Sequence, residues 1–151
     1  MTPAPIEELL PHRGTMLLLD RVLEFSAERV SAQYAPRRDA WYADAHGNMP
    51  AWLGIELMAQ AIAAHVGLLK RSEGKPVAPG ILLGTRRYEA QRPAFAAGEL
   101  LRISAAVSFR DESGFGAYDC GIEAGGASLA RATLKVLEPS DFKSLLRSTT
   151  S

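Results

Sequence analysis

A nearly continuous apolar segment follows Pro50 and constrains the fold more than any other feature. Residues 51–69 read AWLGIELMAQAIAAHVGLL, and their only polar side chains are Glu56, Gln60 and His65. Proline is favoured where a helix begins, because its missing N–H would have no partner in the first turn. The segment therefore predicts a helix at about 51–70. Because the helix has no wide polar stripe, we expect it to be buried.

The composition sets the broad class. The chain has 151 residues, 47% of them apolar and 23% charged, which is typical of one soluble domain spanning 1–151. Lys plus Arg and Asp plus Glu each number 17, and this zero net charge argues against nucleic acid or an anionic membrane as the main partner. Cys120 is the single cysteine, so no internal disulfide is possible. We expect a cytoplasmic protein, since the first residues resemble no signal peptide and the apolar segment carries too many polar groups for a membrane span.

Alternating apolar and polar residues predict an antiparallel sheet. The expected strands are 15–25, 29–35, 100–110, 115–123 and 128–136, with a loop at 36–48, a helical turn at 5–10 and a polar tail at 139–151. One predicted inner face comprises Leu101, Ile103, Ala105, Val107 and Phe109. A single long helix needs another layer to bury it. We therefore expect an α+β domain in which a strongly curved sheet wraps the helix, with Cys120 in the core.

Glu56 is the unusual residue of the helix. Glu56 and Gln60 are four residues apart and share one face, whereas His65 points the opposite way at 100° per residue. Burying an isolated carboxylate is costly and favours its protonated form. His46, in the preceding loop, is then the histidine placed to reach Glu56, and such a pair is the apparatus of general acid–base catalysis. The alternative is that Glu56 belongs to a structural polar network and His46 is an exposed loop residue.

Three segments resemble β-hydroxyacyl-(acyl carrier protein) dehydratases, and in detail the dehydratase-like branch associated with aryl polyene biosynthesis. They are LLPHRGTMLLLDRVLEF, MPAWLGIELMAQAIAA and LLGTRRYEAQRPAFAAGELLRI, in the family's order over roughly residues 8 to 105. The resemblance implies the hot-dog fold and a homodimer or heterodimer with two sites at its interface. Each site takes a His from one subunit and a helix Glu or Asp from the other. The substrate is an acyl group on the phosphopantetheine arm of acyl carrier protein or CoA, with no further cofactor and no metal.

The resemblance also assigns residues. Glu56 matches the helix acid, Gln60 matches the Gln after it, and Ala51 replaces the family's Gly. The family places eight steps between its His and the Pro that opens the helix, whereas His46 precedes Pro50 by four. Either a shorter loop brings His46 to the same role, or Tyr42 stands at the ungapped position.

The implied mechanism is loss of water from a β-hydroxyacyl thioester. His46 would take the α-proton, and Glu56, protonated by burial, would protonate the departing hydroxyl. Gln60 would orient Glu56 or the water. The N–H groups of Ala51 and Trp52 at the helix start would polarise the thioester carbonyl.

Other residues have weaker assignments. Arg86, Arg87 and Arg92 would meet the carrier protein or the pantetheine phosphate, or simply form a solvated strand face. His12 is expected to pack at the strand entrance, and His65 in the core or a dimer seam. Two other functions remain open: a hot-dog thioesterase, and a non-catalytic or half-catalytic subunit that partners an active dehydratase.

Overall fold

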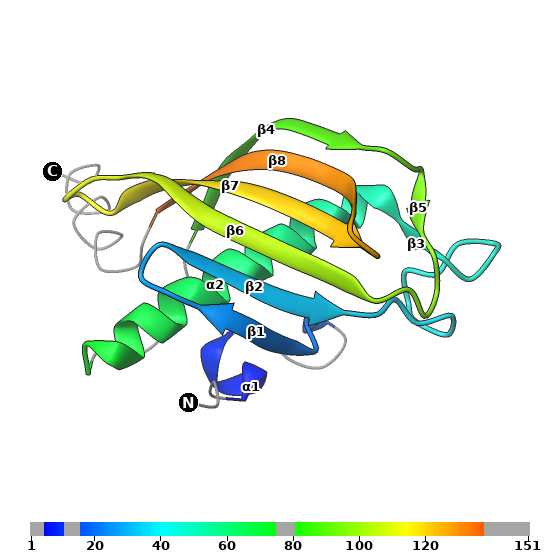
Figure 1. Ribbon diagram of the computed structural model, residues 1–151, viewed down its shortest axis with the longest axis horizontal. Helices are drawn as coiled ribbons and strands as arrows, with labels where there is room; N and C mark the ends of the chain where they lie inside the picture. Colours follow the sequence, from blue (N-terminus) through cyan, green and yellow to red (C-terminus); the bar gives the residue numbers. More distant parts are fainter. Residues whose placement is uncertain (1–4, 11–15, 75–80, 138–151) are drawn as a thin grey trace, which may run out of the picture.

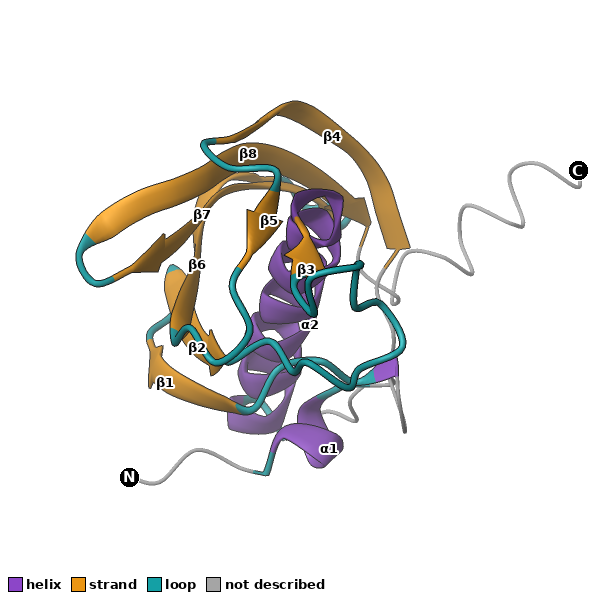
Figure 2. Cartoon of the chain, turned by 90° about the vertical axis from the view of Figure 1, so that its right-hand side faces the viewer, coloured by secondary structure: helices purple, strands orange, loops and turns teal. Residues whose placement is uncertain are grey.

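A six-stranded antiparallel sheet curves around one long helix, as Figures 1 and 2 show from two directions. The computed structural model describes residues 5–10, 16–74 and 81–137. His12 and the predicted tail at 139–151 lie outside these residues. The predicted α+β hot-dog architecture, with a central helix wrapped by the sheet, is confirmed.

The main sheet has the strand order β1-β2-β6-β7-β8-β4, and a second sheet pairs β3 with β5. The helical elements are α1 (Ile6–Leu9), the 3₁₀ turn η2 (Ala51–Leu53) and α2 (Gly54–Ser72). The strands are β1 (Arg21–Phe25), β2 (Arg29–Tyr34), β3 (Met49–Pro50), β4 (Ile81–Ala90), β5 (Ala94–Phe95), β6 (Leu101–Arg110), β7 (Phe115–Ala124) and β8 (Ala127–Leu137). The predicted helix at 51–70 corresponds to η2 followed by α2.

The helix α2 forms the centre of the core. Its fully buried apolar side chains include Leu57, Met58, Ala61 and Ala64. By length and composition alone, Ala51–Ser72 is long and apolar enough to cross a membrane, with a mean hydropathy of 1.4. However, 61% of the most apolar 18-residue stretch of this helix is buried inside the fold, as expected for the core helix of a globular domain.

Two predictions about strands were wrong in detail. The strand predicted at 15–25 begins only at Arg21, because the N–H groups of Leu18 and Leu19 bind a side chain of α2 instead of a neighbouring strand. Phe109 is 57% exposed rather than buried. The register of β6 against β7 shifts between Val107 and Phe109, and such an irregularity breaks the alternation of faces.

His65 lies in the core, as expected, within a chain of hydrogen bonds. Its Nε2 donates to the Ser26 carbonyl at 2.9 Å, and its Nδ1 accepts from the Tyr118 hydroxyl at 2.8 Å. Arg110 donates to the Tyr118 oxygen at 2.7 Å. Because the Ser26 carbonyl can only accept, Nε2 carries a proton, and a neutral imidazole then has Nδ1 free to accept from Tyr118. Burial lowers the pKa of His65, and the positive charge of Arg110 lowers it further, while the hydrogen bond to Ser26 opposes both.

We predict that His65 makes stability decrease as the pH falls. Below about 6.5 the unfolded chain protonates this histidine while the folded chain keeps it neutral, so up to about 1.4 kcal/mol is lost per pH unit until the lowered folded pKa is reached. Urea unfolding of the parent and His65→Gln between pH 7.5 and 5 measures the difference. Exposed His46→Ala is the control. Equal pH slopes for the parent and His65→Gln would contradict the prediction.

Candidate functional site

Contacts from the sheet side fix the start of the central helix. The Tyr88 hydroxyl of β4 donates to the Ala51 carbonyl. It passes so close to Gly54 that a Cβ there would lie 2.2 Å from the Tyr88 oxygen. The Ala51 N–H donates to the Pro93 carbonyl at 2.9 Å. This N–H is therefore already used, and the expectation that Ala51 polarises a substrate carbonyl is wrong for this structure. The corresponding role of the Trp52 N–H stays a prediction.

The two loops beside the helix start are joined to each other. Residues 36–50 precede the helix, and residues 91–99 connect β4 to β6. The Asn48 side chain accepts the Ala97 N–H at 3.0 Å, and the Gly98 N–H donates to the Pro36 carbonyl at 2.8 Å. With the short β3–β5 ladder, these bonds hold Pro36 and residues 48–50 of the first loop against the second loop.

Gln60 connects Glu56 to the segment before β1. Its Nε2 donates to Glu56 Oε1 at 3.0 Å and to the Met16 carbonyl at 2.7 Å. Its Oε1 accepts the N–H groups of Leu18 at 3.0 Å and Leu19 at 3.3 Å. Gln60 is fully buried, and both of its amide donors and its acceptor are used. The expected neighbouring pair is present, since Gln60 donates a hydrogen bond to the Glu56 carboxylate, and its role in orienting Glu56 or the water stays a prediction.

Glu56 is less buried than expected. Its side chain has intermediate exposure in the single chain, whereas the sequence predicted a buried or nearly buried carboxylate. The helix start is flanked by Trp52, whose exposed fraction is 64%.

His46 lies on the surface of the preceding loop, and among the described residues no hydrogen bond joins its side chain to Glu56. Its N–H donates to Asp44 Oδ1 at 2.9 Å, and the Asn48 N–H donates to the same oxygen at 3.0 Å. These N–H groups, from Asn48 first and His46 second, lower the pKa of Asp44. The shortened loop is thus a turn closed by Asp44. The role of His46 as the base stays a prediction.

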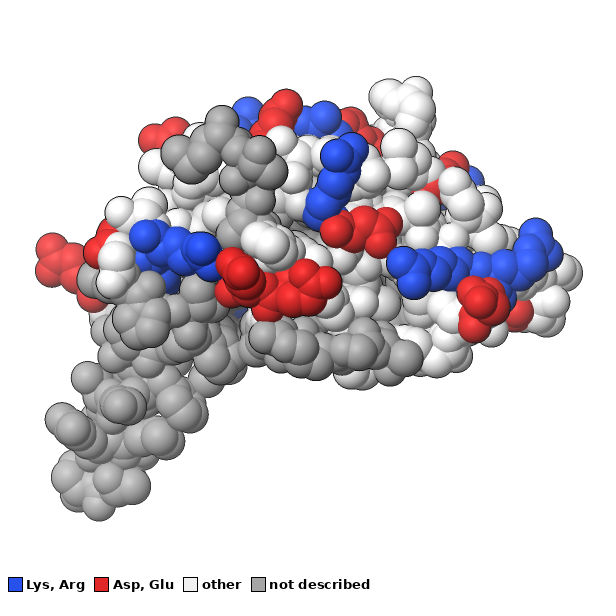
Figure 3. Space-filling model, turned by 90° about the horizontal axis from the view of Figure 1, so that it is seen from below, with Lys and Arg blue, Asp and Glu red and all other residues white. Residues whose placement is uncertain are grey.

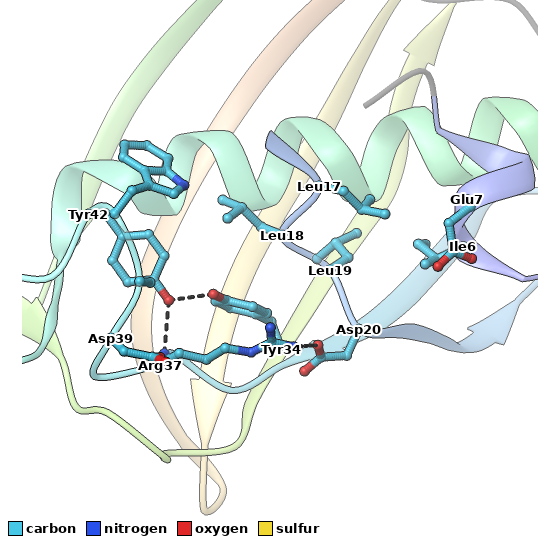
Figure 4. Close-up of a pocket in the computed structure, with 12 residues that line it drawn as sticks. Ile6, Glu7, Leu17, Leu18, Leu19, Asp20, Tyr34, Arg37, Asp39 and Tyr42 are labelled. Carbon is cyan, nitrogen blue, oxygen red and sulfur yellow. Dashed lines mark hydrogen bonds and ion pairs between the residues drawn. The ribbon is translucent and has the colours of Figure 1, made fainter. Parts of the chain in front are cut away.

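Tyr42 is buried rather than presented to solvent. Its hydroxyl accepts the Arg37 N–H at 2.9 Å and is hydrogen-bonded to the Tyr34 hydroxyl. Figure 4 shows these two hydroxyls turned toward each other in the wall of a cavity of about 640 Å³. The lining does not include Glu56, Gln60 or His46. Sequence reasoning missed this cavity, because Tyr34 lies in a strand and Tyr42 in a loop, with no local pattern that pairs them.

The three arginines considered for carrier binding differ in their surroundings. Arg86 and Arg87 are exposed on β4, where Arg87 has a φ of 52° beside a register shift. Arg92 pairs with Glu99 at 2.6 Å. On the face seen in Figure 3, acidic and basic side chains are interspersed, with no broad field of one sign. Their role in carrier binding stays a prediction. Among the described residues, no three His, Cys, Asp or Glu side chains gather into a metal site.

Comparison with solved structures defines the class first. A long helix inside a curved antiparallel sheet is the hot-dog fold. The PaaI protein from the phenylacetic acid degradation operon of E. coli shares it, with a TM-score of 0.62, 18% identity, and coverage of 78% of this chain and 82% of that chain. At this identity the likeness shows the fold alone.

The family follows from closer relatives. Residues 4–147 match the ApeP-like family, described as ApeP dehydratase. The dehydratase heterocomplex ApeI:P from Xenorhabdus doucetiae contains a chain with 32% identity and a TM-score of 0.86, and the match covers 95% of this chain and 97% of that one. The protein described here belongs to the ApeP-like dehydratase family.

A curated relative matches a shorter stretch. The 3-hydroxyacyl-[acyl-carrier-protein] dehydratase FabZ of Oenococcus oeni is 41% identical over 80 residues. That match spans 50% of this chain and 58% of the length of the relative.

We predict that Gln60→Ala destabilises the protein by about 3 kcal/mol, because it leaves buried N–H and carbonyl groups of the 16–19 segment without partners. Urea unfolding measures the loss, and amide hydrogen exchange should accelerate at Leu18 and Leu19. The matched control is Gln33→Ala, whose side chain has a 3.5 Å exposed bond to Arg21, and whose effect should stay within about 1 kcal/mol. Unchanged exchange at Leu18 and Leu19 would refute the role assigned to Gln60.

Proposed function

We propose that this protein takes part in the dehydration of a β-hydroxyacyl thioester, carried on acyl carrier protein or CoA, to a trans-enoyl thioester. The observation that supports this most directly is the Glu56–Gln60 pair at the start of the buried helix, in a chain of the ApeP-like dehydratase family. We place the activity in fatty acid or aryl polyene-like biosynthesis in the cytoplasm.

The reaction balances without a redox partner. A base removes the α-proton, the β-carbon loses its hydroxyl, and a carbon–carbon double bond forms between them. Glu56 donates a proton to the departing hydroxyl, which leaves as water. Gln60 holds the carboxyl group in one orientation, and the base later returns its proton to Glu56 through water. Burial of Glu56 by a second chain would favour the protonated form that this role needs.

We propose that the base comes from a second hot-dog chain facing Glu56. Within one protomer, His46 is exposed and makes no hydrogen bond to Glu56 among the described residues, and the side chain of Glu56 has intermediate exposure. A dimer would cover this side chain and present a histidine from the partner. The similar chain from Xenorhabdus doucetiae is part of a dehydratase heterocomplex, which favours a hetero-oligomer over a homodimer for this protein.

A second candidate follows from the same loop. In a half-catalytic subunit, this chain would supply Glu56 to one site and no functional base to the other. The observations that favour it are the closed Asp44 turn, which holds His46 at the surface, and the buried Tyr42 at the family's ungapped histidine position. A hot-dog thioesterase is the third candidate, and thiol release separates it from dehydration, which releases none.

Turnover of β-hydroxyacyl carrier thioesters by the pure protein, and by its mixture with a hot-dog dehydratase partner, tests the assignment. Glu56→Gln should lower kcat by about 10²- to 10⁴-fold with little change in KM, as expected when a general acid is removed. The exposed acid Glu28→Gln is the control and should match the parent. Enoyl product at the parent rate from Glu56→Gln, or free thiol as the product, would overturn the proposal.

His46→Ala then separates a homodimer, in which His46 of a second copy is the base, from a half-catalytic subunit. In the homodimer, this variant of the pure protein should lose activity as severely as Glu56→Gln. If the chain is half-catalytic, the pure parent should be inactive, and the mixture should depend on Glu56 but not on His46.

A further inference from the structure

The tyrosine cavity is a candidate ligand site separate from Glu56. Its volume of about 640 Å³ is in the range of small-molecule pockets. Buried apolar side chains of Ile6, Leu18 and Leu19 form part of its lining, and the ring of Trp41 stands at its edge with an exposed fraction of 53%. Trp41 packs edge-on against Tyr42, with ring centroids 5.6 Å apart. This apolar part of the wall suits a ring-shaped or acyl group, while charged and hydroxyl-bearing side chains line the rest of the cavity.

One of the two tyrosine O–H groups has no hydrogen-bond acceptor among the described residues. Tyr34 and Tyr42 are 3% and 6% exposed, and together they carry two O–H protons. Their mutual bond uses one proton, whichever hydroxyl donates, and the Arg37 N–H only adds a donor to Tyr42. Neither hydroxyl has another partner recorded among the described residues. Burial raises the pKa of Tyr34 above its usual value, so it remains a protonated donor. A buried O–H without an acceptor is costly, so we expect a hydrogen-bond acceptor to lie in this cavity.

Charge around the cavity narrows the choice of acceptor. Among the described residues that line it, Glu7, Asp20 and Asp39 are acidic and Arg37, which lies 3.6 Å from Asp20, is the one cation. Three carboxylates against one guanidinium repel an anionic ligand. A neutral oxygen, such as a carbonyl, meets no such penalty.

We propose that this cavity binds a neutral aryl or acyl group whose carbonyl oxygen accepts the spare tyrosine O–H. The wall of the cavity is coupled to the Glu56 region, because the Leu18 and Leu19 N–H groups are bound by Gln60, which also binds Glu56. Two sources share this chemistry: the acyl thioester of the proposed function, and an independent small molecule.

Acetophenone and ethylbenzene are matched probes, since both carry a phenyl ring and only the first has a carbonyl. Binding is followed by the indole N–H resonance of Trp41 in ¹⁵N-labelled protein. The chain has two tryptophans, and Trp52→Phe assigns the resonances. We expect saturable shifts at Trp41, and no binding of benzoate, the anionic counterpart.

The deciding quantity is the ratio of the ethylbenzene Kd to the acetophenone Kd. A change in the apolar surroundings alters both Kd values alike, so this ratio reports the contact made by the carbonyl oxygen. Tyr34→Phe and Tyr42→Phe each keep one free O–H, so their ratios should stay within about twofold of the parent. The double variant has no O–H left, and its ratio should fall about tenfold, the worth of one hydrogen bond. Ala40→Trp fills the cavity and should abolish both bindings.

An unchanged ratio in the double variant, or no saturable binding of either probe to the parent, would overturn the proposal. Retained ethylbenzene binding shows that the double variant keeps its cavity. If the double variant does not fold, saturable binding to the parent and its loss in Ala40→Trp decide the matter.

Inhibition kinetics distinguish the two possible ligands, the acyl group of the substrate and an independent small molecule. If the ligand is the substrate's own acyl group, acetophenone should raise the KM for β-hydroxyacyl thioester and leave kcat unchanged. If the ligand is an independent molecule, acetophenone should not compete. The binding measurements need no turnover, so failure of the proposed dehydratase activity leaves this test intact.

Discussion

The burial of α2 in the concave face of the sheet is the constraint on which the rest of the structure depends. Full burial of a large apolar side chain stabilises a fold by about 1.5 to 3 kcal/mol. Two polar side chains on this helix, Gln60 and His65, are also fully buried and must find partners there. Gln60 finds them in the segment before β1, and His65 in the β1–β2 turn and β7. The buried polar groups of one helix thereby fix segments on both of its sides.

Local periodicity predicted what depends on nearby residues. The helix after Pro50, the strands near 101–110, 115–124 and 127–137, and the shared face of Glu56 and Gln60 all follow from spacing within one element. The late start of β1 did not, since it depends on Gln60, some forty residues further along the chain. Phe109 was misplaced because a shift in register is a property of two strands together.

Contacts between distant segments explain the remaining differences at the candidate site. Nothing near Ala51 in the sequence indicates that its N–H would be taken by Pro93, and the residue pair Tyr34 and Tyr42 meets across a loop. The partial exposure of Glu56 has another cause, because an apolar pattern marks a surface for burial without saying whether its own chain or another covers it. This chain therefore places Gln60 in a hydrogen bond with Glu56, and the roles of both residues in catalysis stay predictions.

The bonds between the loops at 36–50 and 91–99 have a mechanical consequence. Asn48 with Ala97 and Gly98 with Pro36 connect the two loops to each other, and Ala51 with Pro93 connects the second loop to the helix start. A displacement of residues 93–98 would therefore be transmitted both to residues 36 and 48–50 and to the first turn of the helix. The entrance beside Glu56 is thus constrained by two segments that are far apart in the sequence.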